Sequence, residues 1–499
     1  MRRPPSRSGS MTAGRPRAES SDAGGGDLES PRAAGTPTGA AALAAAAAVA
    51  PSAPRAALAA VALVYLVQGL LGLSRLAVFV LFKDEMNLDP ATVALLTGAS
   101  AAPWVIKPLY GFLSDAIPLF GYRRRSYLAI CGAASAASWA ALGSGAATGS
   151  PGAALAALLV GSAATACADV VADSIVVELS RGEAQGGAGR LQSLCWGSAA
   201  AGGVASAYLS GSLVQDYGPR PVFWLTALCP LLVCAAAAVI PEKRVASGGG
   251  RLFFSTGGGD AGGGRPAGAQ AAPSLRAAAG AQARALWAAA SARHILLPTL
   301  FVFAWQATPS ADSALLFFET NELGFSTEFL GRLRLVGALA SLAGVGVYNF
   351  ALREAPLRRV FLWTGLTGAA LGLTQLALVT RTNLAWGISD ELFALADSAL
   401  LTALAQVAFM PVLVLAARLC PEGVEASLFA ALMSILNAGG ALGSAAGAGL
   451  TSALGVTATD FSRLPALVAL CTLGGLAPLA LLGLVPDDSP GGKSGKERE

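Results

Sequence analysis

The chain has 499 residues, of which 54% are hydrophobic and 13% are charged, and its formal net charge is +4. The charged share is about half that of a soluble globular protein, which excludes an ordinary soluble domain. No basic stripe with interleaved aromatic residues accompanies the positive charge, so nucleic acid is not an expected partner. The partner that this composition predicts is the lipid bilayer.

Runs of mostly apolar residues recur almost from one end of the chain to the other. They predict an all-α membrane protein, because a transmembrane helix needs about 20 such residues. We predict about twelve transmembrane helices of that length, with ten or eleven as the alternative. They lie near residues 57–82, 91–113, 126–147, 152–178, 191–213, 221–241, 294–318, 329–351, 357–380, 392–417, 424–452 and 464–485.

Three segments lack this apolar character. Residues 1–56 are rich in Arg, Ser, Gly and Ala, and residues 1–18 contain arginines but no acid. This composition predicts either a disordered tail or a transit peptide for a plastid or mitochondrion, and both interpretations stay open. Residues 242–292, rich in Gly and Ala, predict a low-complexity cytoplasmic linker. The polar residues 486–499 predict a disordered C-terminal tail.

The central linker divides the predicted spans into two sets of six, at residues 57–241 and 293–485. Weak internal repeats relate the two sets, since Gln68 precedes Ser74 at the same offset at which Gln306 precedes Asp312. Small residues at every fourth position let helices approach closely, and they occur in spans five and eleven: Gly203, Ala207, Gly211, Gly439, Gly443 and Gly447. Two six-helix bundles joined by a linker describe the major facilitator fold, in which substrate binds between the bundles.

Basic residues are concentrated in the loops on one side of the predicted helices. If the N-terminus is cytoplasmic, the opposite loops hold only Lys83, Arg220, Arg381 and Arg463. The positive-inside rule then places both termini in the cytoplasm, or in the stroma if the membrane is a plastid one. We therefore expect a multi-pass integral membrane protein, with the plastid (chloroplast) envelope and the plasma membrane or another membrane as alternative locations.

One stretch between two apolar runs carries the most specific signal. Residues 104–128 read WVIKPLYGFLSDAIPLFGYRRRSYL, which resembles the signature of the folate–biopterin transporter family, a branch of the major facilitator superfamily. Further stretches resemble the same family at residues 169–181, 298–325, 329–349 and 408–437. The resemblance covers residues 60–485 in order and is closest to the plant and cyanobacterial type.

This resemblance implies a secondary active transporter that moves folate and/or biopterin-type pterins by alternating access, with proton coupling expected. The expected partners are then a small-molecule substrate and protons, and we expect the protein to be a monomer. A major facilitator carrier for another organic anion or a sugar is the alternative. An alternative of a different class is a non-transporting membrane receptor or a membrane-embedded enzyme.

Ionisable residues inside the predicted spans are candidate functional residues, because a charge at the bilayer centre costs about 2.5–3.5 kcal/mol. Asp169 and Asp173 are four residues apart and share one helix face. A carboxylate can grip the amino-pyrimidinone edge of a pterin, and Lys or Arg can bind the carboxylates of folate. The candidates for substrate binding or coupling are Lys107, Asp169, Asp173, Asp312, Gln306, Trp305, Arg75, Arg334 and Tyr65.

Each of these assignments has a structural alternative. Lys107 is near the end of its span and its side chain could reach the membrane interface. Asp173 could belong to a structural charge cluster with Glu178 and Arg181. Arg75 could pair with Asp312 across the two bundles and act as a gate rather than a ligand.

The loop after the second span resembles the loop motif of major facilitators. In that superfamily, the aspartate and arginines of the motif lock the two bundles at the cytoplasmic face, and charge pairs that form in one state bias the equilibrium between states. Orientation by positive charge alone is the competing interpretation, which explains the arginines but not Asp115 or Gly111. The predicted gate residues are Gly111, Asp115, Gly121, Arg123, Arg124 and Arg125.

The sequence offers nothing that predicts catalysis. It shows no nucleophile with an adjacent base, no metal-ligand spacing among its cysteines, and no nucleotide-binding glycine loop. We therefore expect no enzymatic activity, no cofactor and no metal site.

Overall fold

The computed structural model describes residues 55–180, 185–242, 244, 284, 291–352, 354–418 and 425–486. All of them belong to one compact unit, Gly39–Glu499. Within these ranges the chain is helical, and the one extended pairing is an isolated bridge between Leu119 and Tyr122. The predicted tails, nearly all of the predicted linker, and Arg181 lie outside the described residues.

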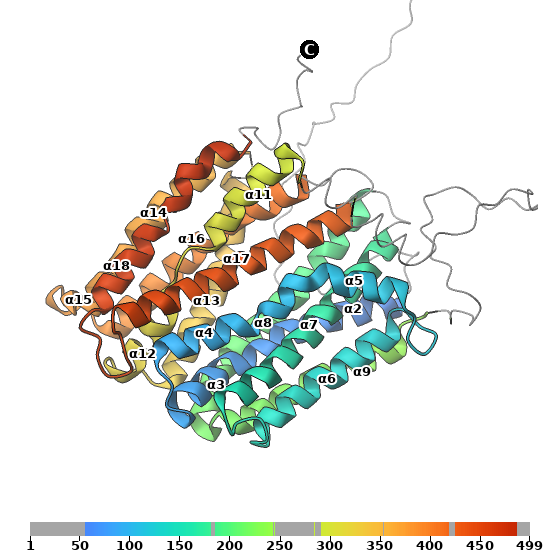
Figure 1. Cartoon of the computed structure of the whole chain (residues 1–499), viewed down its shortest axis with the longest axis horizontal. Helices are drawn as coiled ribbons and strands as arrows, with labels where there is room; N and C mark the ends of the chain where they lie inside the picture. The colour runs from blue at the N-terminus through green and yellow to red at the C-terminus, as the bar shows by residue number, and fades with distance from the viewer. Residues whose placement is uncertain are drawn as a thin grey trace, which may run out of the picture. The chain divides into compact units, whose positions relative to one another are not determined.

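The first half of the chain forms the N-terminal bundle. Its first two spans are interrupted, and the next four are continuous helices (Figure 1). The elements are α2 (Arg55–Leu70), η1 (Leu71–Leu73), α3 (Ser74–Val80), η2 (Leu81–Glu85), α4 (Pro90–Ser100), η3 (Ala102–Ile106), α5 (Lys107–Ala116), α6 (Arg125–Gly143), α7 (Pro151–Ser180), α8 (Gln185–Tyr217) and α9 (Pro219–Val239).

The second half forms the C-terminal bundle and repeats this plan. Its first span is interrupted, and its last ends in a 3₁₀ segment that contains Pro478. The elements are α11 (Arg293–Gln306), α12 (Asp312–Asn321), α13 (Thr327–Val347), η4 (Tyr348–Leu352), α14 (Leu357–Val379), α15 (Thr382–Ala385), α16 (Asp390–Arg418), α17 (Glu425–Ala453), α18 (Leu464–Gly474) and η5 (Ala477–Leu484).

Among the described helices, nine are long and apolar enough to cross a membrane. The three predicted spans that do not qualify lie near residues 91–113, 191–213 and 294–318. The first and third are broken into shorter helices, while the second corresponds to the long helix α8, which is rich in glycine and serine. Broken membrane helices are tolerated where the irregular backbone is buried in protein or lines a cavity.

Proline explains the interruption of the second span. Pro103 lies in the first turn of η3 and Pro108 in the first turn of α5. Because proline has no backbone N–H and its ring clashes with the preceding turn, the α-helix stops at Ser100 and resumes at Lys107. The side chain of Lys107 is therefore presented at a new helix start inside the membrane span.

Glycines of α17 pack closely against the non-helical segment that interrupts the seventh span. A Cβ atom would lie 2.9 Å from the Gln306 Cβ if added to Gly439, and 2.6 Å from the Thr308 oxygen if added to Gly443. At Gly447 it would lie 2.2 Å from the Ser310 oxygen. The predicted close approach of the eleventh span is confirmed, and it positions the irregular segment that leads to Asp312.

The fifth span also approaches its neighbours closely through small residues. Gly211 lies against Gly331 of α13, where an added Cβ would be 2.8 Å from the Gly331 Cα. Gly203 lies against α2, because a Cβ added to Gly69 would be 2.6 Å from the Gly203 N. Its neighbour Gly202 packs on the same helix, with an added Cβ 2.3 Å from the Leu66 oxygen.

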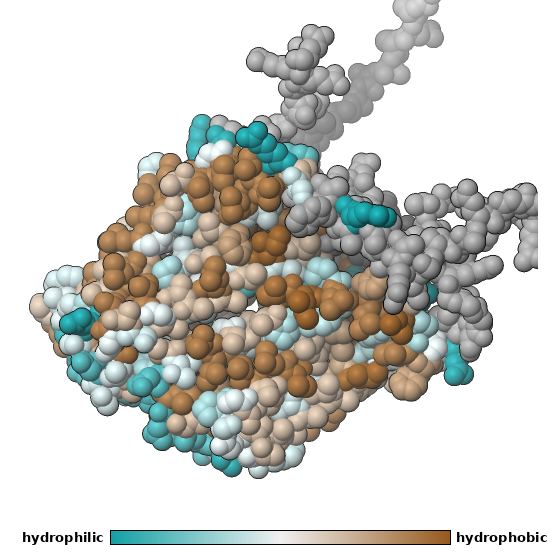
Figure 2. All heavy atoms as spheres, viewed as in Figure 1, coloured by the Kyte–Doolittle hydropathy of each residue, from teal (hydrophilic) through white to brown (hydrophobic). Residues whose placement is uncertain are grey.

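The two bundles meet mainly along two helix pairs. In Figure 1 the red helix α17 lies beside the blue helix α4, and Gly98 of α4 faces Ser444 of α17. The second pair is α8 with α13. Figure 2 shows hydrophobic residues along the sides of the helices and hydrophilic residues gathered toward their ends, as expected of helices surrounded by lipid.

Candidate functional site

The first part of the site is a polar cluster inside the N-terminal bundle. Lys107 Nζ at the start of α5 lies 2.5 Å from Asp169 Oδ2 of α7, and the side chains are only 13% and 9% exposed. Gln68 Nε2 of α2 donates a hydrogen bond of 3.0 Å to Asp169 Oδ1. Lys107 Nζ also lies 5.1 Å from the centre of the Trp104 ring. Lys107 is thus held by a carboxylate and an indole rather than extended to the membrane interface.

The second carboxylate of the cluster lies one helical turn further along α7. The Tyr65 hydroxyl of α2 donates a short hydrogen bond to Asp173 Oδ1. Asp173 Oδ2 has no hydrogen-bond partner within the described part of the chain. We call Tyr65, Gln68, Lys107, Asp169 and Asp173 the N-bundle polar cluster. It contains two carboxylates but one basic side chain, that of Lys107.

The structure brings together four of the predicted residues here: Tyr65, Lys107, Asp169 and Asp173. It separates Asp173 from Glu178, which instead pairs with Arg124. Gln68 and Trp104 were not predicted as site residues. The repeat that relates Gln68 to Gln306 was the signal for the glutamine, while Trp104 is the first residue of the family-like stretch but carries no charge to single it out.

Arg75 and Arg334 lie on different bundles and interact electrostatically. Arg75 is exposed, and Arg334 is partly buried. Neither forms an ion pair or a hydrogen bond with another residue of the described ranges. The alternative in which Arg75 pairs with Asp312 is not adopted in this conformation. We call Arg75 and Arg334 the arginine pair.

The carboxylates of the C-terminal bundle form a separate group. Asp312 begins α12, and Glu319 lies two turns further along the same helix. Glu319 interacts electrostatically with Asp312 and with Asp397 of α16, which accepts a 2.5 Å hydrogen bond from Thr374 Oγ1. Glu319 was missed because the predicted seventh span ended one residue before it. We call Asp312, Glu319 and Asp397 the C-bundle acidic cluster.

Trp305 and Gln306 lie at the end of α11, next to the interruption. The Trp305 ring packs against Phe301 and Phe361, with ring centres 5.8 and 5.5 Å apart. Gln306 packs against Gly439 of α17. Both side chains are partly buried, and their contacts lie within the C-terminal bundle rather than with the N-bundle polar cluster.

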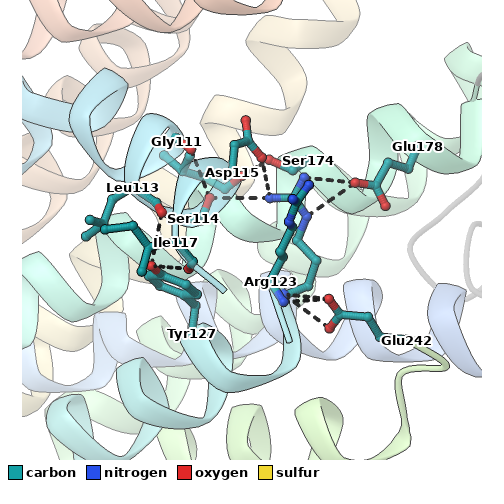
Figure 3. A network of polar contacts seen from close by, with 12 residues as sticks. Gly111, Leu113, Ser114, Asp115, Ile117, Arg123, Tyr127, Ser174, Glu178 and Glu242 are labelled. Atoms are coloured by element: carbon teal, nitrogen blue, oxygen red, sulfur yellow. Dashed lines mark hydrogen bonds and ion pairs between the residues drawn. The ribbon is translucent and has the colours of Figure 1, made fainter. Parts of the chain in front are cut away.

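The predicted gate residues form a charge network that is confined to the N-terminal bundle (Figure 3). Arg124 Nη1 lies 2.8 Å from Asp115 Oδ1, and Arg124 Nη2 lies 2.8 Å from Glu178 Oε1. Arg124 Nη1 also donates a 3.3 Å hydrogen bond to Ser114 Oγ. Burial opposes the charge of Arg124, but its hydrogen bond to Glu178 and the charge of Asp115 outweigh burial and raise the pKa of Arg124.

A reciprocal helix capping arrangement holds this loop. The Glu242 carboxylate accepts hydrogen bonds from the backbone N–H groups of Arg123, Arg124 and Arg125, at 2.6, 3.1 and 2.9 Å. These groups form the start of α6, where a negative charge is favourable. In return, the Arg125 guanidinium donates to the carbonyl oxygens of Ala237 and Ala238 at the end of α9, at 3.0 and 2.9 Å. Glu242 was not predicted.

Two glycines allow close packing of the loop and of the helix that precedes it. Gly121 has a φ of 83°, and an added Cβ would lie 2.9 Å from the Arg244 Cγ. Gly111 of α5 lies against α7, where an added Cβ would be 3.3 Å from Val170 Cγ1. Both positions therefore favour glycine, the first because of its left-handed backbone.

Among the described residues, the hydrogen bonds between the bundles lie away from the 117–124 loop. We call the end of the helices that carries this loop the loop end, and the opposite end the far end. At the far end Thr327 Oγ1 donates to Gln215 Oε1 at 2.8 Å, and the Ala458 N–H donates to Asp89 Oδ1 at 3.2 Å. Near the middle Asn437 Nδ2 donates to the Trp104 oxygen at 3.3 Å. The structure is therefore closed at the far end.

Solved structures identify the fold. A crystal structure of the nucleoside transporter NupG superposes with a TM-score of 0.61 at 13% identity, over 86% of this chain and 98% of NupG. A crystal structure of a D-xylose-proton symporter superposes with a TM-score of 0.57 at 16% identity, over 86% of this chain and 98% of the symporter. The class defined by the fold is an all-α, multi-pass membrane protein with the major facilitator fold, as predicted.

Sequence relatives identify the family. The BT1 family model matches residues 68–497. A folate-biopterin transporter of Synechocystis sp. is 46% identical over 427 residues, covering 86% of this chain and 81% of the relative. The probable folate-biopterin transporter 4 of Arabidopsis thaliana is 32% identical over 456 residues, covering 83% of this chain and 92% of the relative. The chain belongs to the BT1 family, and it is a membrane transporter rather than an enzyme.

Proposed function

We propose that this protein is a secondary active transporter that moves folate and/or biopterin-type pterins by alternating access. The names of its relatives support this substrate class. The observation that carries the proposal is the N-bundle polar cluster, in which two carboxylates of one helix face, a lysine and a tyrosine meet inside a membrane bundle.

The cluster suits the edge of a pterin ring. The amino-pyrimidinone edge presents neighbouring N–H donors, which a carboxylate can accept in pairs. Asp169 has both oxygens engaged, by Lys107 and Gln68, whereas Asp173 keeps Oδ2 free. Asp173 is therefore the proposed acceptor for the pterin edge. Tyr65 holds it in place, and the Trp104 ring offers an aromatic face for the flat pteridine.

We further propose that transport is coupled to protons through Asp173. Lys107 forms an ion pair with Asp169, whereas the hydrogen-bond partner of Asp173 among the described residues is the neutral Tyr65 hydroxyl, and the charge of Lys107 reaches Asp173 without a direct contact. A proton on Asp173 would balance the remaining charge when no substrate is bound. Asp312 in the C-bundle acidic cluster is the alternative proton carrier, because this cluster interacts with no basic residue that the structure describes.

The proposal extends to location and assembly. The Arg-rich, acid-free residues 1–18 favour the plastid envelope over the plasma membrane. One chain supplies both bundles, so we propose that the monomer is the transporting unit. A fluorescent C-terminal fusion and light scattering of the purified protein would test these two points, respectively.

Uptake by proteoliposomes tests the proposed function. Vesicles that contain the protein should accumulate labelled folate or biopterin when a pH gradient is imposed, and protein-free vesicles should not. Lys107→Ala and Asp173→Asn should lower uptake strongly, while Arg332→Gln serves as a control because Arg332 is exposed and paired only with Glu328. Native rates in both cluster variants would contradict the proposed site.

A carrier for another organic anion or for a sugar remains the second candidate. The fold alone permits it, as the D-xylose-proton symporter illustrates. Competition separates the candidates: unlabelled pterin should suppress folate uptake, whereas excess xylose should not. Uptake suppressed by the sugar and not by the pterin would favour the alternative.

A further inference from the structure

The arginine pair has a position that the proposed pterin site does not explain. Phe79 of α3 contacts Phe317 of α12 with ring centres 5.4 Å apart, so this face of α3 points toward the C-terminal bundle. Arg75 precedes Phe79 by four residues and therefore lies on the same face. Arg75 thus faces the other bundle and not the lipid. Its helix neighbours Ser74 and Leu76 point elsewhere and are buried.

Arg334 faces back toward Arg75 from the other side. Gly331 of α13 lies against Gly211 of α8, which fixes one face of α13 against the N-terminal bundle. Arg334 follows Gly331 by three residues on that same face. The two arginines therefore meet across the interface between the bundles, where their charges interact. Since Arg75 is exposed, solvent reaches this space.

Two like charges that face each other without a carboxylate partner are unfavourable in a membrane interior. The C-bundle carboxylates do not relieve them: Glu319 interacts electrostatically with Asp312 and Asp397, not with the arginines. Lys107 differs from the arginine pair, because Asp169 already neutralises it. The arginine pair is thus the part of the site at which a negatively charged group of the substrate would supply the missing partner.

We propose that Arg75 and Arg334 form a clamp for the glutamate carboxylates of folate, and that this clamp distinguishes folates from pterins that lack glutamate. The clamp deepens the proposed function and rests on it for the identity of the substrate. A guanidinium binds a carboxylate through two parallel N–H donors. Two guanidinium groups from opposite bundles match the two carboxylates of one glutamate.

The spacing of the two sites suits an extended substrate. Arg75 lies ten residues beyond Tyr65 in the first span, which corresponds to about 15 Å at about 1.5 Å per residue. A folate whose pteridine contacts Asp173 would therefore point its p-aminobenzoyl-glutamate end toward the far end of the protein. A glutamate held from both sides also stabilises the far-end closure, because the bundles cannot separate there without releasing one carboxylate.

Binding of the glutamate half alone tests the clamp directly. The purified full-length protein should bind p-aminobenzoyl-glutamate more tightly than p-aminobenzoate, as measured by calorimetry. Arg75→Gln and Arg334→Gln should each weaken binding of p-aminobenzoyl-glutamate by about tenfold to a hundredfold, the effect of losing a charge-assisted hydrogen-bond pair. Arg332→Gln, on the same helix as Arg334, should not change it. Equal affinity for the two compounds, or native affinity in both arginine variants, would overturn the clamp.

Uptake measurements distinguish a failure of the clamp from a failure of the proposed transport function. In Arg75→Gln and Arg334→Gln, uptake of folate relative to biopterin should fall by about tenfold or more. An equal loss for both substrates would show that the arginines support the fold or the transport cycle, and would overturn the clamp. If the native protein moves neither folate nor biopterin, the proposed function fails, and the binding experiment still decides whether the clamp exists.

Discussion

Lys107 and Asp169 form an ion pair of 2.5 Å between α5 and α7, at the point where proline interrupts the second span. The pair explains how a lysine is retained inside a membrane helix, because its charge is matched by a nearby carboxylate. Within the N-bundle polar cluster, it also leaves Asp173 as the carboxylate without an ion pair among the described residues.

Removal of one partner of this pair should destabilise the protein. Lys107→Ala leaves Asp169 buried and unpaired, and the loss of one partner of a buried ion pair costs about 3–5 kcal/mol. The double variant Lys107→Ala with Asp169→Asn removes both charges and should regain part of this stability without regaining uptake. Thermal unfolding in detergent measures the first effect, and proteoliposome uptake the second. A Lys107→Ala protein as stable as the native one would contradict the assigned ion pair.

Asp173→Asn should uncouple transport from the proton gradient. The asparagine keeps the size of the side chain and a partner for Tyr65 but carries no titratable group. An imposed pH gradient should then no longer accelerate uptake, whereas exchange of internal for external substrate should persist at a reduced rate, because the amide also binds the pterin edge less well than the carboxylate. Tyr65→Phe should weaken exchange, because Asp173 loses the hydroxyl that holds it. A native response to the pH gradient in Asp173→Asn would move the coupling role to another residue, with Asp312 the next to test.

Arg124→Gln should slow transport more than Asp115→Asn. The first change removes contacts with Asp115, Glu178 and Ser114 together, whereas the second leaves the Glu178 contact in place. Uptake rates at matched protein amounts measure the difference, and protease protection of the loop checks that orientation is preserved. Unchanged transport in both variants would leave positive charge for orientation as the only role of the loop.

Gly447→Ala should disturb the interruption of the seventh span. The added Cβ would lie 2.2 Å from the Ser310 oxygen, so α17 or the irregular segment at Ser310 must shift, and such overpacking typically costs about 1–3 kcal/mol. Gly449→Ala is a matched control on the same helix, because nothing lies within 4 Å of its added Cβ among the described residues. The melting temperature should fall for Gly447→Ala only. Equal melting temperatures for the two variants would show that α17 and the interruption are not closely packed.

The fold was predictable because apolar runs of membrane length dominate the chain. The interruptions after Ser100 and Gln306 were not predicted, since the mean hydropathy of a span stays high even where the helix is locally broken. Prolines mark both places, at Pro103 and Pro309. The irregular backbone there depends on packing against glycines that are far away in the sequence.

The site was predictable where a charge stands inside an apolar run. Asp169 and Asp173 share a helix face by spacing alone, and Lys107 was the obvious cation to consider. Glu242 and Glu319 were missed because each stands at the end of a run and resembles a loop residue. Glu242 contacts the start of α6, and Glu319 interacts with Asp397 of α16 as well as with Asp312 on its own helix, so the contacts between elements follow from the three-dimensional packing and not from local pattern.

The decisive measurement is uptake of labelled folate and biopterin across a pH gradient by proteoliposomes that contain the native protein or Asp173→Asn. An inward proton gradient should accelerate uptake by the native protein, and Asp173→Asn should lose that acceleration. Absence of uptake of both substrates by a correctly folded native protein would contradict the proposed function.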